Sequence, residues 1–178
     1  MAVHQDLWTL AEEAIDEYLI AADKCVKFHK PDGGCLGVPA ALLLLCVVNA
    51  LGTYLRDEIV NIGGKVQPIT KREPFRVLNH PLLGQNLSTA QIKRVEHAYR
   101  NALAHEALMW PGHWLTPAPA IPPFGFQGEQ ISISVPSLYA AVERAWRNFD
   151  KSKIKGSIEK FRLAGIEKFR VRKPRPVS

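Results

Sequence analysis

Apolar residues recur every three or four positions near the start of the chain, which is the spacing of one helix face. This spacing predicts a first helix over residues 6–28. A second helix is predicted over residues 38–62, with Pro39 in its first turn and Gly63-Gly64 ending it. The first half of this second helix is apolar on nearly every side. It is therefore expected at the centre of a helical bundle or at a subunit interface.

Two further helices are predicted later in the chain. Residues 65–87 show little periodicity and are expected to be mostly irregular. Ser88 is a good N-cap for a third helix, whose expected stripe is Ile92, Val95, Tyr99, Ala102, Leu103 and Glu106. The fourth helix is expected over residues 137–151. Its predicted inward positions are Leu138, Ala141, Val142, Ala145 and Phe149.

Between these two helices, residues 111–136 break the helical pattern. Several prolines indicate an extended, stiff segment. Two short alternating runs, 124–126 and 131–135, lie on either side of a turn containing Gly128, which predicts a small β-hairpin. The elements together predict an all-α fold: a bundle of four to five helices with the hairpin inserted before the fourth. The expected division is a helical domain over residues 1–150 and a basic C-terminal helix or tail over 151–178.

The positive charge of the chain is concentrated at its end. The chain carries a net charge of +6, and residues 151–178 hold ten Lys or Arg against two acids. The sequence Ile-Glu-Lys-Phe-Arg occurs twice there, at 158–162 and 166–170. A basic segment bearing aromatic residues suits a polyanion, and RNA is the expected partner. The candidate RNA-binding residues are Lys160, Arg162, Lys168, Arg170 and Arg172. The alternative is a docked last helix with a solvated cationic face.

Other features narrow the class of protein. The first residues lack the basic start of a signal peptide, and the most apolar stretch, 36–51, is shorter than the ~20 residues of a membrane span. We therefore expect a cytoplasmic protein without a membrane segment. The three cysteines, Cys25, Cys35 and Cys46, have no metal-binding spacing. Reduced thiols are expected, and neither a metal nor a cofactor.

The segment from Tyr99 to Glu106 contains the strongest candidate chemistry. It reads Arg100-Asn101-x-x-x-His105 within the predicted third helix. Asn101 and His105 are one turn apart and nearly eclipsed, and Arg100 lies about 140° around the helix from His105. Arginine holds phosphate through two parallel hydrogen bonds, and histidine transfers protons near neutral pH. These side chains are a minimal set for cutting RNA without a metal.

Several polar residues are weaker candidates for supporting roles. His97 could assist His105, Asn49 could hold the motif row from behind, and Asp57 with Glu58 could orient Arg100. The respective alternatives are a surface histidine, a satisfied core amide and a solvated helix end. Glu106 follows the histidine directly and is expected to cap or pair locally. The simplest alternative is that His105 only caps the C-terminus of its helix, since histidine is common in a last turn.

The segment resembles the signature of HEPN domains, small all-helical bundles in which Arg-polar-x(3–5)-His marks the ribonuclease members. The resemblance extends over residues 1 to about 150, because the apolar run 37–45 and Asn49-Ala50-Leu51-Gly52 resemble the helix pair before the motif. It implies a HEPN-like helical bundle and a site assembled by dimerisation. HEPN toxins controlled by a nucleotidyltransferase antitoxin often carry tyrosine two residues after the histidine. This chain has Ala107 at that position and so departs from the pattern of those toxins.

The expected function is therefore a metal-independent endoribonuclease of toxin or phage-defence type. It would cleave RNA by 2′-hydroxyl transesterification at a composite site in a homodimer, with Arg100, Asn101 and His105 as its catalytic residues. An antitoxin or a defence-system protein is a further expected partner. Two alternatives remain open. One is a non-catalytic HEPN-like module that binds nucleotide or RNA, and the other is a regulatory partner subunit.

Overall fold

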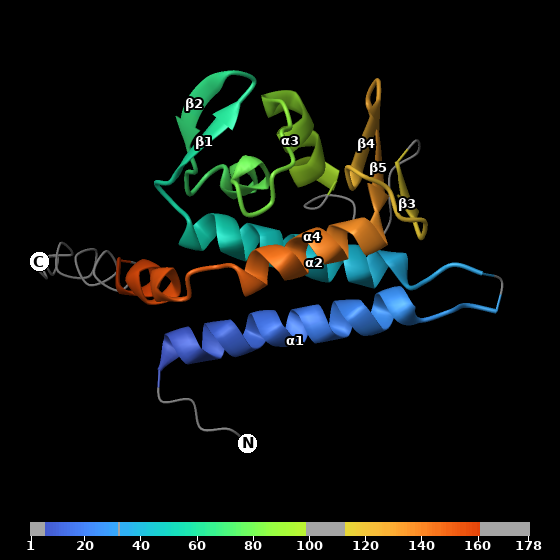
Figure 1. Cartoon of the computed structure of the whole chain (residues 1–178), viewed down its shortest axis with the longest axis horizontal. Helices are drawn as coiled ribbons and strands as arrows, with labels where there is room; N and C mark the ends of the chain where they lie inside the picture. Colours follow the sequence, from blue (N-terminus) through green and yellow to red (C-terminus); the bar gives the residue numbers. More distant parts are fainter. Residues whose placement is uncertain (1–5, 32, 99–112, 161–178) are drawn as a thin grey trace, which may run out of the picture.

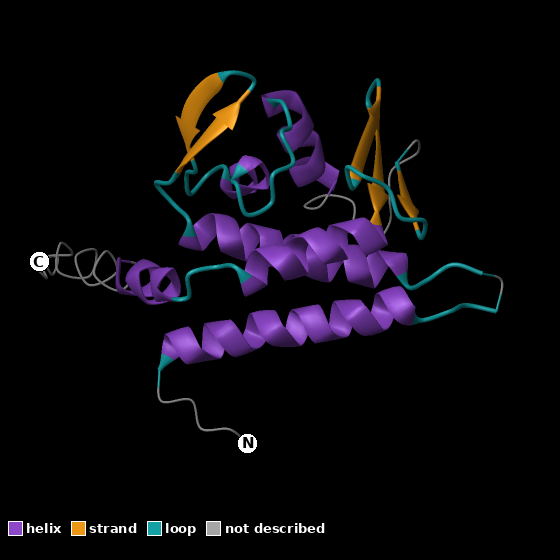
Figure 2. Cartoon of the chain, viewed as in Figure 1, coloured by secondary structure: helices purple, strands orange, loops and turns teal. Residues whose placement is uncertain are grey.

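The computed structural model describes residues 6–31, 33–98 and 113–160. Figures 1 and 2 show the helices α1, α2 and α4 lying side by side. A hairpin of β1 and β2, the short 3₁₀ helix η1, the helix α3 and a second small sheet lie on the side of α2 and α4 away from α1 (Figure 1). Buried side chains from all these groups form one hydrophobic core.

The predicted first helix is confirmed as α1, Leu7–Lys27. Asp6 caps it by accepting a hydrogen bond from the Thr9 amide at 2.9 Å. The buried face of α1 differs from the apolar stripe that predicts the helix, which is Leu7, Leu10, Ala11, Ala14, Tyr18, Ala21 and Cys25. Ile15, Leu19 and Ala22 are the buried residues, and the exposed ones include Leu7, Leu10 and Tyr18. Thus α1 carries two apolar faces and buries one of them.

The second helix, α2, Gly37–Tyr54, is the central helix that the sequence predicts. Its packing partners include α1, α4 and η1. Its buried residues are Ala40, Ala41, Leu44, Leu45, Val47, Val48, Leu51 and Gly52. Within the described part of the chain, α2 alone is long and apolar enough to cross a membrane by length and composition, and 44% of the relevant window is buried in the protein.

The predicted extension of this helix to residue 62 is wrong. After Tyr54 the chain turns at Asp57, whose φ of 74° is left-handed, and it continues as β1, Ile59–Ile62. β1 pairs antiparallel with β2, Lys65–Pro68. Gly63 and Gly64 have φ of 59° and 81° and form the tight turn of this hairpin. They connect two strands and do not end a helix.

Residues 65–87 are also more regular than predicted. Besides β2, they contain η1, Pro74–Asn79, which buries Pro74, Phe75, Val77 and Leu78. η1 packs directly on α2 at Gly52. A Cβ built on Gly52 would meet the backbone of Pro74, with its carbonyl carbon at 2.7 Å and its Cα at 2.9 Å. Glycine is required here by this close approach of two backbones.

The predicted N-cap of the third helix is confirmed. α3 is described over Thr89–His97, and Ser88 and Gln91 form a reciprocal capping box. Ile92 and Val95 are buried, as their places in the apolar stripe predict. The remaining stripe residues, which are Tyr99, Ala102, Leu103 and Glu106, lie outside the described residues.

The predicted hairpin is confirmed by β4, Phe124–Gln127, and β5, Gln130–Ser134. The sequence did not predict the third strand, β3, Trp114–Thr116, which pairs parallel with β5. The helix α4, Val135–Arg147, follows β5 directly. Its predicted inward residues are all buried: Leu138, Ala141, Val142, Ala145 and, just beyond its end, Phe149.

The all-α fold class is therefore wrong, because the chain is a mixed α/β protein with an antiparallel pair and a three-stranded mixed sheet. The strands have only three to five residues each. β1, β2 and β3, which the sequence does not predict, are too short to give a sustained period-two pattern beside long helices. Residues 152–160 form a further helix. Ile154 in it is fully buried, so the first part of the basic segment packs on the body.

Candidate functional site

The catalytic candidates Arg100, Asn101 and His105 lie outside the described residues, as does Glu106. The described part of α3 ends at His97, whose side chain is exposed. The tail candidates Arg162, Lys168, Arg170 and Arg172 also lie outside the described residues. Support for a catalytic role of this motif therefore comes from the sequence alone.

Three other candidates fall on described residues. Asn49 is half-buried on α2, and its backbone carbonyl oxygen accepts a hydrogen bond from the Thr53 hydroxyl at 3.0 Å. Asp57 and Lys160 were proposed for separate roles from the sequence, but the fold brings them together. The Lys160 ammonium lies 3.9 Å from the Asp57 carboxylate.

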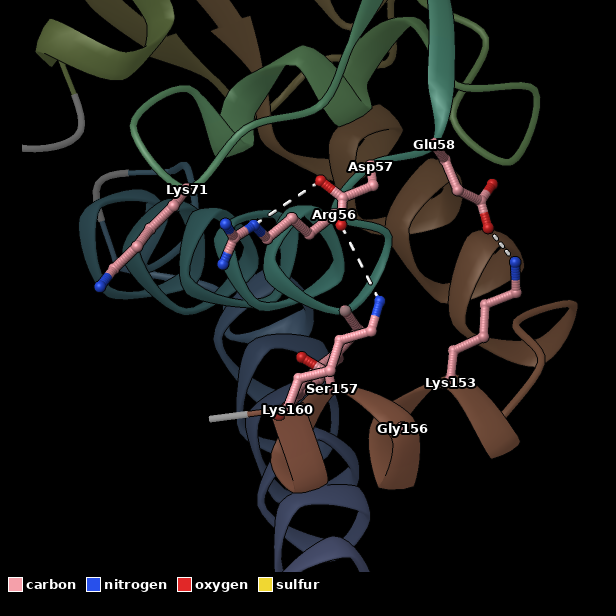
Figure 3. Close-up of a pocket in the computed structure, with 9 residues that line it drawn as sticks. Arg56, Asp57, Glu58, Lys71, Lys153, Gly156, Ser157 and Lys160 are labelled. Carbon is pink, nitrogen blue, oxygen red and sulfur yellow. Dashed lines mark hydrogen bonds and ion pairs between the residues drawn. The ribbon is translucent and has the colours of Figure 1, made fainter. Parts of the chain in front are cut away.

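Asp57 and Lys160 line a pocket of about 350 Å³ (Figure 3). The pocket lies where the end of α2, the turn into β1 and helix 152–160 meet. Backbone hydrogen bonds hold the turn, since the Asp57 amide donates to Ile69 at 3.0 Å and the Ile69 amide donates to Glu58 at 2.8 Å. The lining residues are Tyr54, Arg56, Asp57, Glu58, Lys71, Lys153, Gly156, Ser157 and Lys160.

Charge is unbalanced within this pocket. Four lining residues are cationic and two are acidic. Asp57 lies between Arg56 and Lys160 in Figure 3, at 3.8 Å and 3.9 Å respectively. These are long contacts between exposed side chains, and such pairs stabilise a fold by only about 0–1 kcal/mol. The cations around Asp57 are thus held weakly.

On one side of the pocket, Glu58, Lys153 and His80 form a more closely bonded cluster, the Glu58 group. One oxygen of the Glu58 carboxylate pairs with Lys153, and the other accepts from His80 Nε2 at 2.9 Å. The Leu82 amide donates to His80 Nδ1 at 3.3 Å, which requires that nitrogen to be unprotonated. Burial lowers the pKa of His80 from its ordinary value, consistent with a neutral ring that donates from Nε2. Lys153 therefore supplies the charge that balances Glu58.

Tyr54 contributes a neutral wall to the pocket. Burial raises the pKa of its phenol, so the hydroxyl stays protonated and can donate a hydrogen bond. The ring centroid of Tyr54 is 6.3 Å from that of Phe149.

Within the described residues, no group of three His, Cys, Asp or Glu side chains is placed to hold a metal ion. The geometry of this pocket suits the binding of an anion.

A second polar cluster joins α1 to the end of α4. The Trp146 indole donates to Asp16 at 2.6 Å, and the Lys151 ammonium donates to the Trp146 carbonyl at 2.7 Å. Lys151 also lies over the Trp146 ring, 2.8 Å from its centroid. Desolvation lowers the pKa of Lys151 to about 8, opposed by the charges of Asp16 and Glu12. This cluster contacts core elements and is best explained as packing.

Sequence reasoning missed most of the pocket. No sequence pattern marks Arg56, Lys71, Lys153 or His80 as part of a site. The basic composition of residues 151–160 was the available signal. It could not indicate that Lys153 would meet Glu58, which is 95 residues away in the sequence.

No protein-family model matches the chain, and no curated protein or solved structure matches it either. The resemblance to HEPN domains is neither supported nor excluded by these comparisons.

Proposed function

We propose that the protein is a metal-independent endoribonuclease. The observation that carries this proposal is the sequence Arg100-Asn101-x-x-x-His105. It lies downstream of Ser88, which is the N-cap of α3 as the sequence predicts. A helix that continues through the motif would present Asn101 and His105 on one row, with Arg100 beside them. The strongly basic segment after residue 150 adds support, because a cationic surface attracts RNA.

The proposed reaction uses the RNA's own 2′-hydroxyl as nucleophile. His105 removes the 2′-hydroxyl proton, and the 2′-oxygen bonds to phosphorus as the bond to the 5′-oxygen breaks. A second proton donor must then protonate the departing 5′-oxygen. His105 of the partner subunit would supply it in a two-fold dimer. Arg100 holds the charged phosphate, and Asn101 fixes the tautomer of His105.

Single substitutions test these roles on the full-length chain. A general acid or base contributes about 10²- to 10⁴-fold in rate, so His105→Ala is expected to lose cleavage by at least ~10²-fold. Arg100→Lys is expected to be impaired as well, because a single ammonium cannot form the forked contact. The matched control is His29→Ala, an exposed loop histidine. Cleavage of labelled RNA at the wild-type rate by His105→Ala would rule out this assignment.

A second candidate function is a non-catalytic module that binds a nucleotide or RNA. The cationic pocket at Asp57 and Lys160 favours it, because four of the lining side chains are cationic and two are acidic, which suits a bound anion. The same assay separates the two functions. Saturable binding of RNA by the wild type, with no cleavage at any enzyme concentration tested, would favour the module.

A further inference from the structure

Asp57 occupies an unusual place in the pocket between the end of α2 and helix 152–160. Its φ of 74° is rare for a residue other than glycine, asparagine or aspartate. This backbone turn holds the carboxylate between Arg56 and Lys160, as Figure 3 shows. The side chain of Asp57 is nevertheless 69% exposed. A carboxylate that is weakly bound between two cations marks a position where an incoming anion would be stabilised.

We propose that this pocket binds the phosphate of a small phosphomonoester, and that Asp57 competes with that phosphate for Arg56 and Lys160. The lining charges are Arg56, Lys71, Lys153 and Lys160 against Asp57 and Glu58, which leaves a net charge of +2. A phosphomonoester carries close to two negative charges at neutral pH. A phosphodiester carries only one, so it matches this charge less well.

The volume and the walls of the pocket fit a ligand of this size. Small-molecule sites typically measure about 300–1,000 Å³, and this pocket measures about 350 Å³. Ser157 and the Tyr54 hydroxyl provide neutral hydrogen-bonding groups. Nothing lies within 4 Å of the position that a Cβ would take on Gly156, which leaves this wall open.

The two sides of the pocket play different parts in this proposal. The Glu58 carboxylate is already shared by Lys153 and His80, which join three segments of the fold. Among the described residues, the ion pairs of Arg56 and Lys160 are limited to their long contacts with Asp57. A bound phosphate would therefore replace Asp57 as the partner of Arg56 and Lys160. The Asp57 side chain would rotate into solvent, and the Glu58 group would stay in place.

Calorimetric titration of the full chain at constant ionic strength tests the ligand class. The probes are adenosine 5′-monophosphate, inorganic phosphate, adenosine and the diester ApA. Binding of the monophosphate, with adenosine and ApA at least tenfold weaker, is the predicted result. Comparable affinity for inorganic phosphate would show that phosphate alone is recognised, and weaker affinity would show that the nucleoside contributes. ApA is also a minimal substrate of the proposed nuclease, so its titration uses His105→Ala. Binding of adenosine or ApA that equals that of the monophosphate and is weakened by Arg56→Gln would overturn the proposal.

Variants test the competition by Asp57. Asp57→Asn keeps a residue that tolerates positive φ and removes the competing charge. It is therefore expected to tighten monophosphate binding by roughly three- to tenfold. Arg56→Gln and Lys160→Gln are expected to weaken binding by a similar factor. Lys65→Gln, on exposed β2 and away from the pocket, is the control. Unchanged or weaker binding by Asp57→Asn would contradict the proposal.

The pocket and the proposed nuclease share Lys160, which belongs to the basic segment, but they can be tested separately. His105→Ala does not alter any residue that lines the pocket, so it should abolish cleavage and leave monophosphate binding unchanged. Failure of the nuclease proposal would appear as cleavage that persists in His105→Ala. Failure of the pocket proposal would appear in the titrations alone.

Discussion

At the scale of single residues, Glu58 connects segments that are distant in the sequence. It accepts from His80 at 2.9 Å and pairs with Lys153 of helix 152–160. His80 lies just after η1, and Glu58 lies just before β1. The group therefore fastens the basic C-terminal helix to the hairpin side of the molecule. Removing one partner would leave the half-buried Glu58 carboxylate incompletely satisfied.

The neutral His80 predicts how stability responds to acid. Because burial lowers its pKa below 6.5 in the folded state, the unfolded chain takes up a proton first as the pH falls. His80 therefore contributes stability that is present above about pH 6.5 and is lost progressively below it. Urea unfolding at pH 7.5 and pH 5.5 should show a smaller decrease in the free energy of unfolding for His80→Gln than for the wild type. Identical decreases in both proteins would contradict this role.

At the scale of elements, the contact of α2 with η1 requires a small residue. Gly52→Ala would press a methyl group into the backbone of Pro74, which has no flexible side chain to move aside. Overpacking of this kind typically costs about 1–3 kcal/mol. Chemical denaturation should show this decrease in the free energy of unfolding. Gly156→Ala, the same change where a Cβ meets open space, should be neutral or stabilising by up to ~1 kcal/mol. Equal effects at the two positions would argue against the close approach.

The start of α3 can be tested in the same way. Ser88 accepts from the Gln91 amide at 3.3 Å, and the Gln91 side chain accepts from the Ser88 amide at 2.8 Å. Ser88→Ala removes half of this capping box and is expected to cost about 1 kcal/mol of stability. Ser88→Asp should keep most of it, since aspartate is an equally good N-cap. A fully stable Ser88→Ala protein would show that the cap contributes nothing.

At the scale of the whole molecule, the features that sequence reasoning predicted are local ones. Ser88 caps its helix through Gln91, three positions away. The hairpin turn at Gly128 and the buried face of α4 also depend on neighbouring residues. Such features are fixed by spacing that the sequence displays directly.

The features that were missed depend on partners far away in the chain. Residues 59–62 continue the apolar pattern that predicts helix, although the turn at Asp57 and the pairing with β2 make them a strand. β3 has three residues and exists through its parallel pairing with β5. The pocket combines Glu58 with Lys153 and Asp57 with Lys160, so its charge pattern appears only in the folded chain.

The proposed activity of this protein is the cleavage of RNA by 2′-hydroxyl transesterification at His105. The most direct test is to incubate structured, end-labelled RNA with the wild type and His105→Ala in EDTA, and to assign the product ends by mass spectrometry. We expect 2′,3′-cyclic phosphate and 5′-hydroxyl ends from the wild type alone, and no cleavage of DNA of the same sequence. Products ending in a 5′-phosphate, or cleavage that EDTA abolishes, would contradict the proposal.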